Sequence, residues 1–298
     1  MTKRIGLVIN PTSGKGQGAQ IGAEVAGRLQ AQGHEVIDLS GETADASRER
    51  AGDAVTAGLD VLAVLGGDGM VNLGVNLCAG TATALAIVPA GTGNDIARAL
   101  GLPLKDPLAA ARVISSGTVR TIDAGRHTDA DGSSRWFAGV LGAGFDSVVN
   151  ERANTWAWPR GRMRYNLAIA RELPVFKPIP YVIEVDGVRH RTRAMLVAVA
   201  NGPSYGGGMM VCPDASFEDG MFDVLVVHEI SIIEFLKVFP KVFSGTHIGH
   251  PAVEILRGKE VRLEAADIVS YADGERFATL PMTCQNVPGA LNVLVSAP

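Results

Sequence analysis

Residues 61–69 read VLAVLGGDG, and residues 85–95 read LAIVPAGTGND. In each stretch an apolar run with strand character ends in a glycine-rich turn. Glycine has no Cβ, so such a turn is sharp and lets a ligand approach the backbone closely. Open α/β sheets bind phosphate groups at turns of this kind, where a buried strand ends and a helix begins. Each turn also carries an acid, Asp68 or Asp95, which suits a metal held by nucleotide phosphates. The two turns together predict a nucleotide site.

A simpler role for each turn is to cap a helix. An aspartate at a helix start accepts backbone hydrogen bonds, which would account for Asp68 and one glycine. It leaves the glycines on both sides of the acid unexplained, whereas close contact with a polyphosphate explains them. Asn94 and Asp95 fit a cap as well, but their pairing with the first turn favours a nucleotide or metal role. Thr92 adds a hydroxyl that suits contact with a phosphate or a base.

The region around these turns, residues 1–125, alternates strand and helix patterns. Predicted strands lie at 5–9, 35–39, 61–65 and 85–88, and predicted helices at 20–32, 43–57 and 107–116. Helices also follow each glycine turn. This alternation predicts an N-terminal Rossmann-like α/β domain, in which helices cover both faces of a parallel sheet.

Extended runs dominate after about residue 125, and they predict a second domain over residues 126–298. They lie at 136–142, 181–186, 194–200, 222–228, 260–264 and 291–295, and the stretches 147–172 and 231–244 are helical exceptions. Asp186 and Gly187 form a hairpin signal between two of the runs. These features favour an antiparallel β-sandwich, so the fold class is α/β plus β. The last strand is expected to pack onto either domain.

Composition excludes several classes of protein. The chain has 298 residues, a net charge of −4 and three widely spaced cysteines. The acidic balance argues against nucleic acid as a partner. The cysteines lack a CxxC spacing, which favours reduced thiols in a cytosolic protein over disulfides or a zinc site. The first apolar run is too short for a signal peptide, and no run approaches the ~18 apolar residues that span a bilayer. We therefore expect a cytoplasmic protein that is not integral to a membrane.

Three further loops carry candidate functional groups. Residues 10–16 (NPTSGKG) follow the first strand and suit a phosphate-facing turn, although they lack the Walker A spacing and an ordinary connection would look similar. Residues 214–220 place carboxylates and a glycine in a turn that suits a hard cation, with an exposed loop as the alternative. Residues 273–275 (DGE) bring two carboxylates together, where one acts as a general base or the turn merely closes a hairpin.

The segment 152–171 mixes aromatic and positively charged side chains in an acidic protein. It contains Trp156, Trp158, Arg160, Arg162, Arg164 and Arg171. Tryptophan and arginine suit contact with anionic lipid headgroups. The alternative is an amphipathic helix that packs on its own domain.

Taken in order, these motifs resemble the bacterial diacylglycerol kinase and related lipid kinase family over nearly the whole chain. The matching stretches are 10–16, 66–72, 89–98, 201–213, 218–220 and 273–275. The resemblance implies ATP-dependent phosphorylation of a lipid hydroxyl, by default that of diacylglycerol. It places the active site in the cleft between an NAD-kinase-like α/β domain and a β-sandwich. It also implies a protein peripherally associated with the inner face of the membrane, where its lipid substrate lies; a homodimer is an open guess.

The resemblance further implies roles for individual residues. ATP would contact Asn10, Pro11, Thr12, Ser13, Gly14, Ser40, Gly66, Gly67, Asp68, Gly69, Met70, Val71, Asn72, Thr92 and Asn94. Mg²⁺ would be bound by Asp219 and the carbonyls of Ser216 and Met221, and joined through water to Asp68 and Asp95. Glu275 is the first choice for the base that accepts the proton of the substrate hydroxyl, and Asp273 is a close second.

Two residues depart from the family's pattern, and rival functions stay open. Met70 and Ser40 stand where the family usually has threonine, and Met70 removes a hydroxyl near the phosphates. An NAD kinase shares the Gly-Gly-Asp-Gly turn, but residues 89–95 and 273–275 favour a lipid kinase. A non-catalytic lipid-binding regulator would be expected to lose the acids of the cleft, which this chain keeps. The lipid itself is not determined, because sphingoid bases and ceramide-like lipids use much the same residues.

Overall fold

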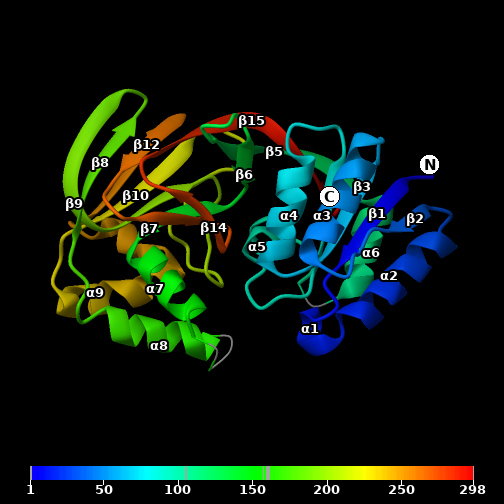
Figure 1. Cartoon of the computed structure of the whole chain (residues 1–298), viewed down its shortest axis with the longest axis horizontal. Helices are drawn as coiled ribbons and strands as arrows, with labels where there is room; N and C mark the ends of the chain where they lie inside the picture. Colours follow the sequence, from blue (N-terminus) through cyan, green and yellow to red (C-terminus); the bar gives the residue numbers. More distant parts are fainter. Residues whose placement is uncertain (1, 105, 157, 159–161, 298) are drawn as a thin grey trace.

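The computed structural model describes residues 2–104, 106–156, 158 and 162–297. The α/β domain is blue to cyan at the right of Figure 1, and the β-sandwich is green to orange at the left. The last strand, drawn in red, runs from one to the other. Through that strand the two domains share one continuous sheet.

Parallel strands form the sheet of the N-terminal domain, in the order β2-β1-β3-β4. Helix α2 packs with α6, and α3 packs with α4. Every residue of β3 and β4 is buried, as expected for a parallel sheet covered on both faces. The elements are β1 (Arg4–Ile9), α1 (Ser13–Gly16), α2 (Gly18–Ala31), β2 (Glu35–Asp38), α3 (Ala44–Thr56), β3 (Val61–Gly66), α4 (Asp68–Cys78), β4 (Ala84–Pro89), α5 (Asp95–Ala99) and α6 (Pro107–Ser116).

Antiparallel strands form the second domain, with helices on one side. The elements are β5 (Thr118–Thr128), β6 (Ser134–Phe137), β7 (Val140–Gly144), α7 (Phe145–Asn154), α8 (Arg162–Glu172), β8 (Ile179–Val185), β9 (Val188–Ala200), β10 (Phe222–His228), α9 (Ile232–Val238), η1 (Phe239–Ser244), η2 (Thr246–Gly249), β11 (Val253–Gly258), β12 (Glu260–Glu264), β13 (Val269–Ala272), β14 (Glu275–Thr279) and β15 (Met282–Val295). One core lies between the strand layers around Phe137 and Phe222. A second lies between the strands and α7–α9 and includes Phe145 and Phe235.

Strand β15 takes part in both domains. Near its start it pairs antiparallel with β12, and along most of its length it pairs with β5. Near its end Val293 pairs in parallel with Leu85 of β4. The expected strand at 291–295 is therefore the end of a much longer one. A crossing strand of this kind joins the two domains by backbone hydrogen bonds.

The predicted extended run 136–142 is wrong as a single strand. The structure breaks it between β6 and β7, at Ala138 and Gly139. The N–H groups of these two residues donate to the carboxylate of Asp273, each at 2.9 Å, instead of to a neighbouring strand. At this point, hydrogen bonds to a buried side chain replace the hydrogen bonds between strands.

Helices α7 and α8 account for the predicted helical stretch 147–172, and α9 with η1 accounts for 231–244. Within the described ranges, no helix is both long enough and apolar enough to cross a membrane. Cys78, Cys212 and Cys284 are buried and unpaired, as the sequence predicts.

Candidate active site between the two domains

The two glycine turns lie backbone to backbone at the ends of β3 and β4. Ala90 N–H donates to the Gly66 carbonyl at 2.8 Å. A Cβ placed on Gly91 would lie 2.3 Å from the Cα of Gly67, so any larger residue there would force the turns apart. The first loop joins the same cluster, because Gly14 N–H donates to the Ala90 carbonyl at 2.9 Å. The predicted meeting of these three segments therefore occurs at the carboxyl edge of the parallel sheet.

Asp68 lies in the first turn of α4 and reaches across to the second glycine turn. Its carboxylate accepts hydrogen bonds from the N–H groups of Asn94 and Asp95, at 3.2 and 3.0 Å. Burial nevertheless raises the pKa of Asp68, because the loss of solvent outweighs these two bonds. A Cβ on Gly93 would lie 2.3 Å from Asp68 Oδ2, which explains the glycine there.

Asp95 connects the α/β domain to the sandwich. Its two oxygens accept hydrogen bonds from the N–H groups of Gly207 and Gly208, each at 2.8 Å, and Arg98 Nη1 lies 2.9 Å away. The glycine-rich loop 201–208 is therefore held against α5. Since its oxygens are occupied in this way, Asp95 contributes first to positioning the domains.

A pocket of about 600 Å³ opens beside the first glycine turn. The predicted nucleotide residues that line it are Asn10, Gly67, Gly69, Met70 and Asn72. Ser40 lies nearby at the sheet edge, where its hydroxyl accepts Ile9 N–H at 3.0 Å. The other residues predicted to contact ATP do not line this pocket: Pro11, Thr12, Ser13, Gly14, Ser40, Gly66, Asp68, Val71, Thr92 and Asn94.

Several residues predicted to contact ATP have side chains that are already buried or hydrogen-bonded within the protein. Val71 is buried in the core. The Asn94 amide closes its own turn through two hydrogen bonds with Gly91, at 3.1 and 2.9 Å. Asn10 Oδ1 accepts both the N–H and the hydroxyl of Thr12. Thr92 lines the neighbouring second pocket instead.

Four polar residues of this pocket were not predicted: Arg48, Asn76, Arg135 and Arg276. They come from α3, α4, β6 and β14, so no local motif unites them. Asn76 holds β6 in place, since its Oδ1 accepts Trp136 N–H at 2.9 Å and its Nδ2 donates to the Trp136 carbonyl at 3.0 Å. The pocket thus holds three arginines, of which Arg135 pairs with Asp129 and Arg276 lies 3.4 Å from Glu151.

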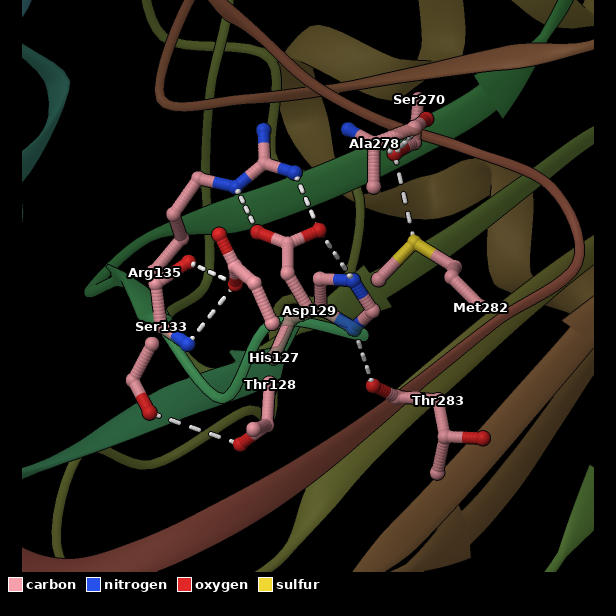
Figure 2. A network of polar contacts seen from close by, with 11 residues as sticks. His127, Thr128, Asp129, Ser133, Arg135, Ser270, Ala278, Met282 and Thr283 are labelled. Carbon is pink, nitrogen blue, oxygen red and sulfur yellow. Dashed lines mark hydrogen bonds and ion pairs between the residues drawn. The ribbon is translucent and has the colours of Figure 1, made fainter.

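Arg135 is held in place by a network around Asp129 (Figure 2). Its Nε and Nη2 donate to the two carboxylate oxygens at 2.8 and 2.7 Å, and its guanidinium lies 5.4 Å from the ring centre of Phe277. The guanidinium lowers the pKa of Asp129. His127 Nε2 lies 3.3 Å from the same carboxylate, and His127 Nδ1 lies 2.7 Å from the Thr283 carbonyl. The Arg135 guanidinium is therefore held in a fixed orientation at the pocket.

The two candidate bases, Asp273 and Glu275, have different surroundings. The Asp273 carboxylate is buried and accepts three N–H donors, from Ala138, Gly139 and Val140, at 2.9, 2.9 and 3.2 Å. Burial raises the pKa of Asp273 to about 6 in spite of these bonds. Its φ of 51° lies in the left-handed region, where an aspartate is tolerated in tight turns.

Glu275 lines the pocket of about 600 Å³ beside the first glycine turn, the nucleotide-side pocket of the sequence prediction. It has no hydrogen-bond partner among the described residues. It keeps contact with solvent, and the surrounding protein atoms raise the pKa of its carboxyl against the opposing effect of Arg48. A Cβ on Gly69 would lie 2.6 Å from Glu275 Oε1, so the Glu275 carboxylate reaches the first glycine turn. Of the two acids, Glu275 is the one with free oxygens.

A second pocket of about 410 Å³ lies on the other side of the same turn. One end is polar and the other apolar. The polar end contains Asp68, Thr92, Asp95, Asp273 and Gly274, and the apolar end contains Ile169, Met209, Phe239 and Phe243. A smaller apolar cavity adjoins it, sharing Ile169, Tyr205, Met209 and Phe239. This shape suits a molecule with one polar end and a hydrocarbon body.

The predicted magnesium residues lie in a separate turn. Asp219 Oδ1 accepts Met221 N–H at 3.1 Å, and Asp219 Oδ2 lies 2.5 Å from Arg257 Nη2. Neither pocket is lined by Asp219, Ser216 or Met221. Across the described residues, no three His, Cys, Asp or Glu side chains group to hold a metal. The structure thus brings Asp68 and Asp95 together, but it keeps this turn apart from their pockets.

Asp146, which no motif singled out, is buried in the smaller apolar cavity. The Tyr205 hydroxyl donates to its Oδ2 at 3.3 Å, and its Oδ1 has no partner in the described part of the chain. Burial raises the pKa of Asp146 from 3.8 to about 6. Between these two values the folded protein binds more protons than the unfolded chain. The ionised carboxylate therefore lowers the free energy of unfolding progressively as the pH rises from about 4 to 7.

Asp146→Asn removes this effect. We expect the free energy of unfolding of the variant, relative to that of the parent, to be about 1–3 kcal/mol higher at pH 7 than at pH 4. Urea unfolding at a series of pH values measures it. Asp131→Asn, at an exposed site, is the control and should show no such gain. A difference that stays constant with pH would show that Asp146 titrates normally.

Comparison with known proteins assigns the family. The family "Diacylglycerol kinase catalytic domain" matches residues 4–127, and the family "YegS C-terminal NAD kinase beta sandwich-like domain" matches residues 139–295. The chain is 40% identical to a diacylglycerol kinase of Mycobacterium tuberculosis over 292 residues, which cover 98% of this chain and 94% of that protein. It is 29% identical to a diacylglycerol kinase of Bacillus subtilis over 297 residues, covering 98% and 96%.

Solved structures show the same fold at low identity. A diacylglycerol kinase from Bacillus anthracis matches with a TM-score of 0.74 at 22% identity, covering 99% of this chain and 97% of that one. An NAD kinase from Archaeoglobus fulgidus in complex with ATP matches with a TM-score of 0.54 at 13% identity, covering 98% and 94%. With the 40% identity above extending over almost the entire chain, the protein belongs to the diacylglycerol kinase family of lipid kinases.

Proposed function

We propose that the protein transfers the γ-phosphoryl group of ATP to the hydroxyl of a membrane lipid, most simply converting diacylglycerol to phosphatidic acid. One observation carries this proposal: the turn 273–275 borders both pockets. Glu275 lines the pocket that contains the three arginines, and Asp273 with Gly274 lines the partly apolar one. A phosphoryl donor in the first pocket and a lipid hydroxyl in the second would meet at this turn.

The pocket lined by Arg48, Arg135 and Arg276 suits the triphosphate. Backbone N–H groups at the start of α4 face developing negative charge, and the helix dipole adds to their effect. Arg48 and Arg135 would complement that charge, and Arg135, which Asp129 already holds, would do so without the entropy cost of ordering a free side chain. The Met70 N–H closes this turn by donating to the Gly67 carbonyl at 3.0 Å, so the missing threonine hydroxyl leaves the turn itself in place.

Glu275 would act as the general base. Its carboxylate takes the proton of the lipid hydroxyl as the hydroxyl oxygen bonds to the γ-phosphorus. The bond between that phosphorus and the β–γ bridging oxygen breaks, and ADP leaves with the bond electrons. A raised pKa brings the carboxyl closer to the pH at which a base works best.

The residues of the Asp219 turn fit a magnesium ion by their chemistry. A carboxylate and two backbone carbonyls are hard oxygen donors, which Mg²⁺ prefers together with water. Beside them Asn286 Nδ2 donates to the Met221 carbonyl at 3.1 Å, and Asn286 Oδ1 is a buried oxygen with no partner among the described residues. We propose Asp219, Ser216 and Met221 as the protein ligands, with water linking them to Asp68 and Asp95. When bound, Mg²⁺ would neutralise charge on the phosphates.

Phosphate transfer from labelled ATP tests the function. The assay contains Mg²⁺ and, in mixed micelles, one of diacylglycerol, a sphingoid base or ceramide, with NAD as a separate acceptor. We expect labelled phosphatidic acid, and its loss when the metal is chelated. Transfer to another lipid would keep the mechanism and change the substrate. Labelled NADP, or no transfer at all, would contradict a lipid kinase activity.

A further inference from the structure

Large apolar side chains gather on the helical side of the second domain. Twelve are exposed in the described chain, and ten of them lie between residues 158 and 248. Of these ten, Val188 is the one that belongs to a strand. Helix α9 illustrates the pattern: Phe235 and Val238 are buried, whereas Ile233 and Leu236 are 69% and 55% exposed. A helix that is apolar on its outer face as well as its inner one has a second surface to cover.

Helices α8 and α9 lie along the same side of the sandwich in Figure 1. On α8, Met163 and Leu167 are exposed. Ile169 of α8 and Phe239 and Phe243 of η1 line the apolar end of the second pocket. Phe243, which is half exposed, therefore belongs both to the exposed apolar surface and to the wall of the pocket that we assign to the lipid.

A row of aromatic rings connects that surface to the interior. Phe145, Phe235, Phe239 and Phe243 follow one another with ring centroids 5.5, 5.6 and 6.4 Å apart. Phe145 is buried and Phe243 is half exposed. The row gives a hydrocarbon chain a continuous apolar path from the surface inward.

Charge favours a negatively charged partner. Residues 160–177 contain five Lys or Arg and one Glu, and residues 231–249 contain two Lys and one Glu, in a chain of net charge −4. The two acids are already occupied, because Glu172 pairs with Arg152 and Glu234 lies 3.2 Å from His250 Nε2. Lys237 and Lys241 are exposed and have no acidic partner among the described residues. Arg160 and the side chain of Arg162 lie outside what the structure describes.

Resting on the proposed function, we propose that α9 and η1 form a second membrane-binding element that, together with α8, seats the second domain on an anionic bilayer. Ile233 and Leu236 enter the headgroup boundary, and Lys237 and Lys241 contact lipid phosphates. The segment 152–171, which the sequence predicts to contact lipid headgroups, would then make only part of the contact with the bilayer. The pocket mouth would face the bilayer, so that a lipid passes along the aromatic row without crossing water.

Vesicle binding by the full-length protein, without ATP, tests this inference. Vesicles consist of phosphatidylcholine alone or of phosphatidylcholine and phosphatidylglycerol in equal parts. Ile233→Ser/Leu236→Ser should weaken binding to the mixed vesicles by about tenfold or more. Lys237→Gln/Lys241→Gln should weaken binding by about tenfold on mixed vesicles only, and added salt should have the same effect. Val119→Ser/Val188→Ser removes two equally exposed apolar side chains elsewhere and should bind as the parent does.

A second measurement separates this inference from the proposed function. Activity towards a short-chain diacylglycerol in true solution should be the same in Ile233→Ser/Leu236→Ser and the parent, while activity on vesicles falls. If no lipid is phosphorylated but the variant still loses vesicle binding, only the proposed function fails. If lipid is phosphorylated and all variants bind vesicles equally, this inference is wrong. A parent dimer that Ile233→Ser/Leu236→Ser converts to a monomer in size-exclusion chromatography would assign the surface to a second copy of the chain instead.

Discussion

Replacing Glu275 with glutamine is expected to lower kcat for lipid phosphorylation by about 10²–10⁴-fold. Glutamine keeps the size of the side chain but cannot accept the proton of the substrate hydroxyl. Because Glu275 has no hydrogen-bond partner in the described residues, its replacement should leave the free energy of unfolding within about 0.5 kcal/mol of the parent value. Steady-state kinetics and urea unfolding of the same preparation measure both effects.

ATP binding distinguishes a lost base from a damaged pocket. The dissociation constant for ATP, measured by calorimetry, should change little in Glu275→Gln, since the phosphate contacts that we propose are made by backbone N–H groups and arginines. A variant that keeps parental kcat would remove Glu275 from the reaction. A variant that loses ATP binding together with activity would assign Glu275 to nucleotide binding instead.

Asp273→Ala is expected to lower the free energy of unfolding by about 2–4 kcal/mol. It leaves the buried N–H groups of Ala138, Gly139 and Val140 without their acceptor, and each unpaired buried donor costs about 1–3 kcal/mol. Relief from burying a carboxylate with a raised pKa offsets part of that loss. Urea unfolding at pH 7 measures the difference.

Asp273→Asn is the matched control. Its amide oxygen can still accept the bonds from Gly139 and Val140, so the variant should lose less stability than Asp273→Ala. We expect it to keep much of the activity, because Asp273 positions the turn that carries Glu275. A stable Asp273→Asn variant that loses 10² or more in kcat, beside an active Glu275→Gln, would make Asp273 the base.

Local sequence predicted the parts of the site that depend on one strand and its following turn. The turns at 66–69 and 91–95 lie where expected because apolar runs form buried parallel strands and only glycine permits such close packing of two turns. The same reasoning missed Arg48 and Arg135. Each arginine looks like an ordinary charged residue on its own element, and only the packing of α3 and β6 beside α4 brings them to one pocket.

Local sequence also failed to determine the surroundings of the acidic residues. Local sequence indicated Asp273 and Glu275 as a pair, and the family resemblance placed Glu275 only narrowly first, because two residues of one turn share every local signal. Their difference arises from residues 138–140, whose N–H groups surround one carboxylate and leave the other free. Asp95 was likewise expected near a metal, and contacts with a glycine loop more than a hundred residues away occupy its oxygens.

By itself, the sequence determined the two-domain class, the phosphate-type turns and the family, since these depend on strand patterns and short motifs that neighbouring residues encode. The tertiary structure alone decided which acid is free, which cations complete the nucleotide-side pocket and how β15 joins the domains. It also showed that the half-exposed Phe243, which follows α9 in η1, lines the second pocket. Such properties arise from burial and from hydrogen bonds between distant segments, and these exist only after the chain has folded.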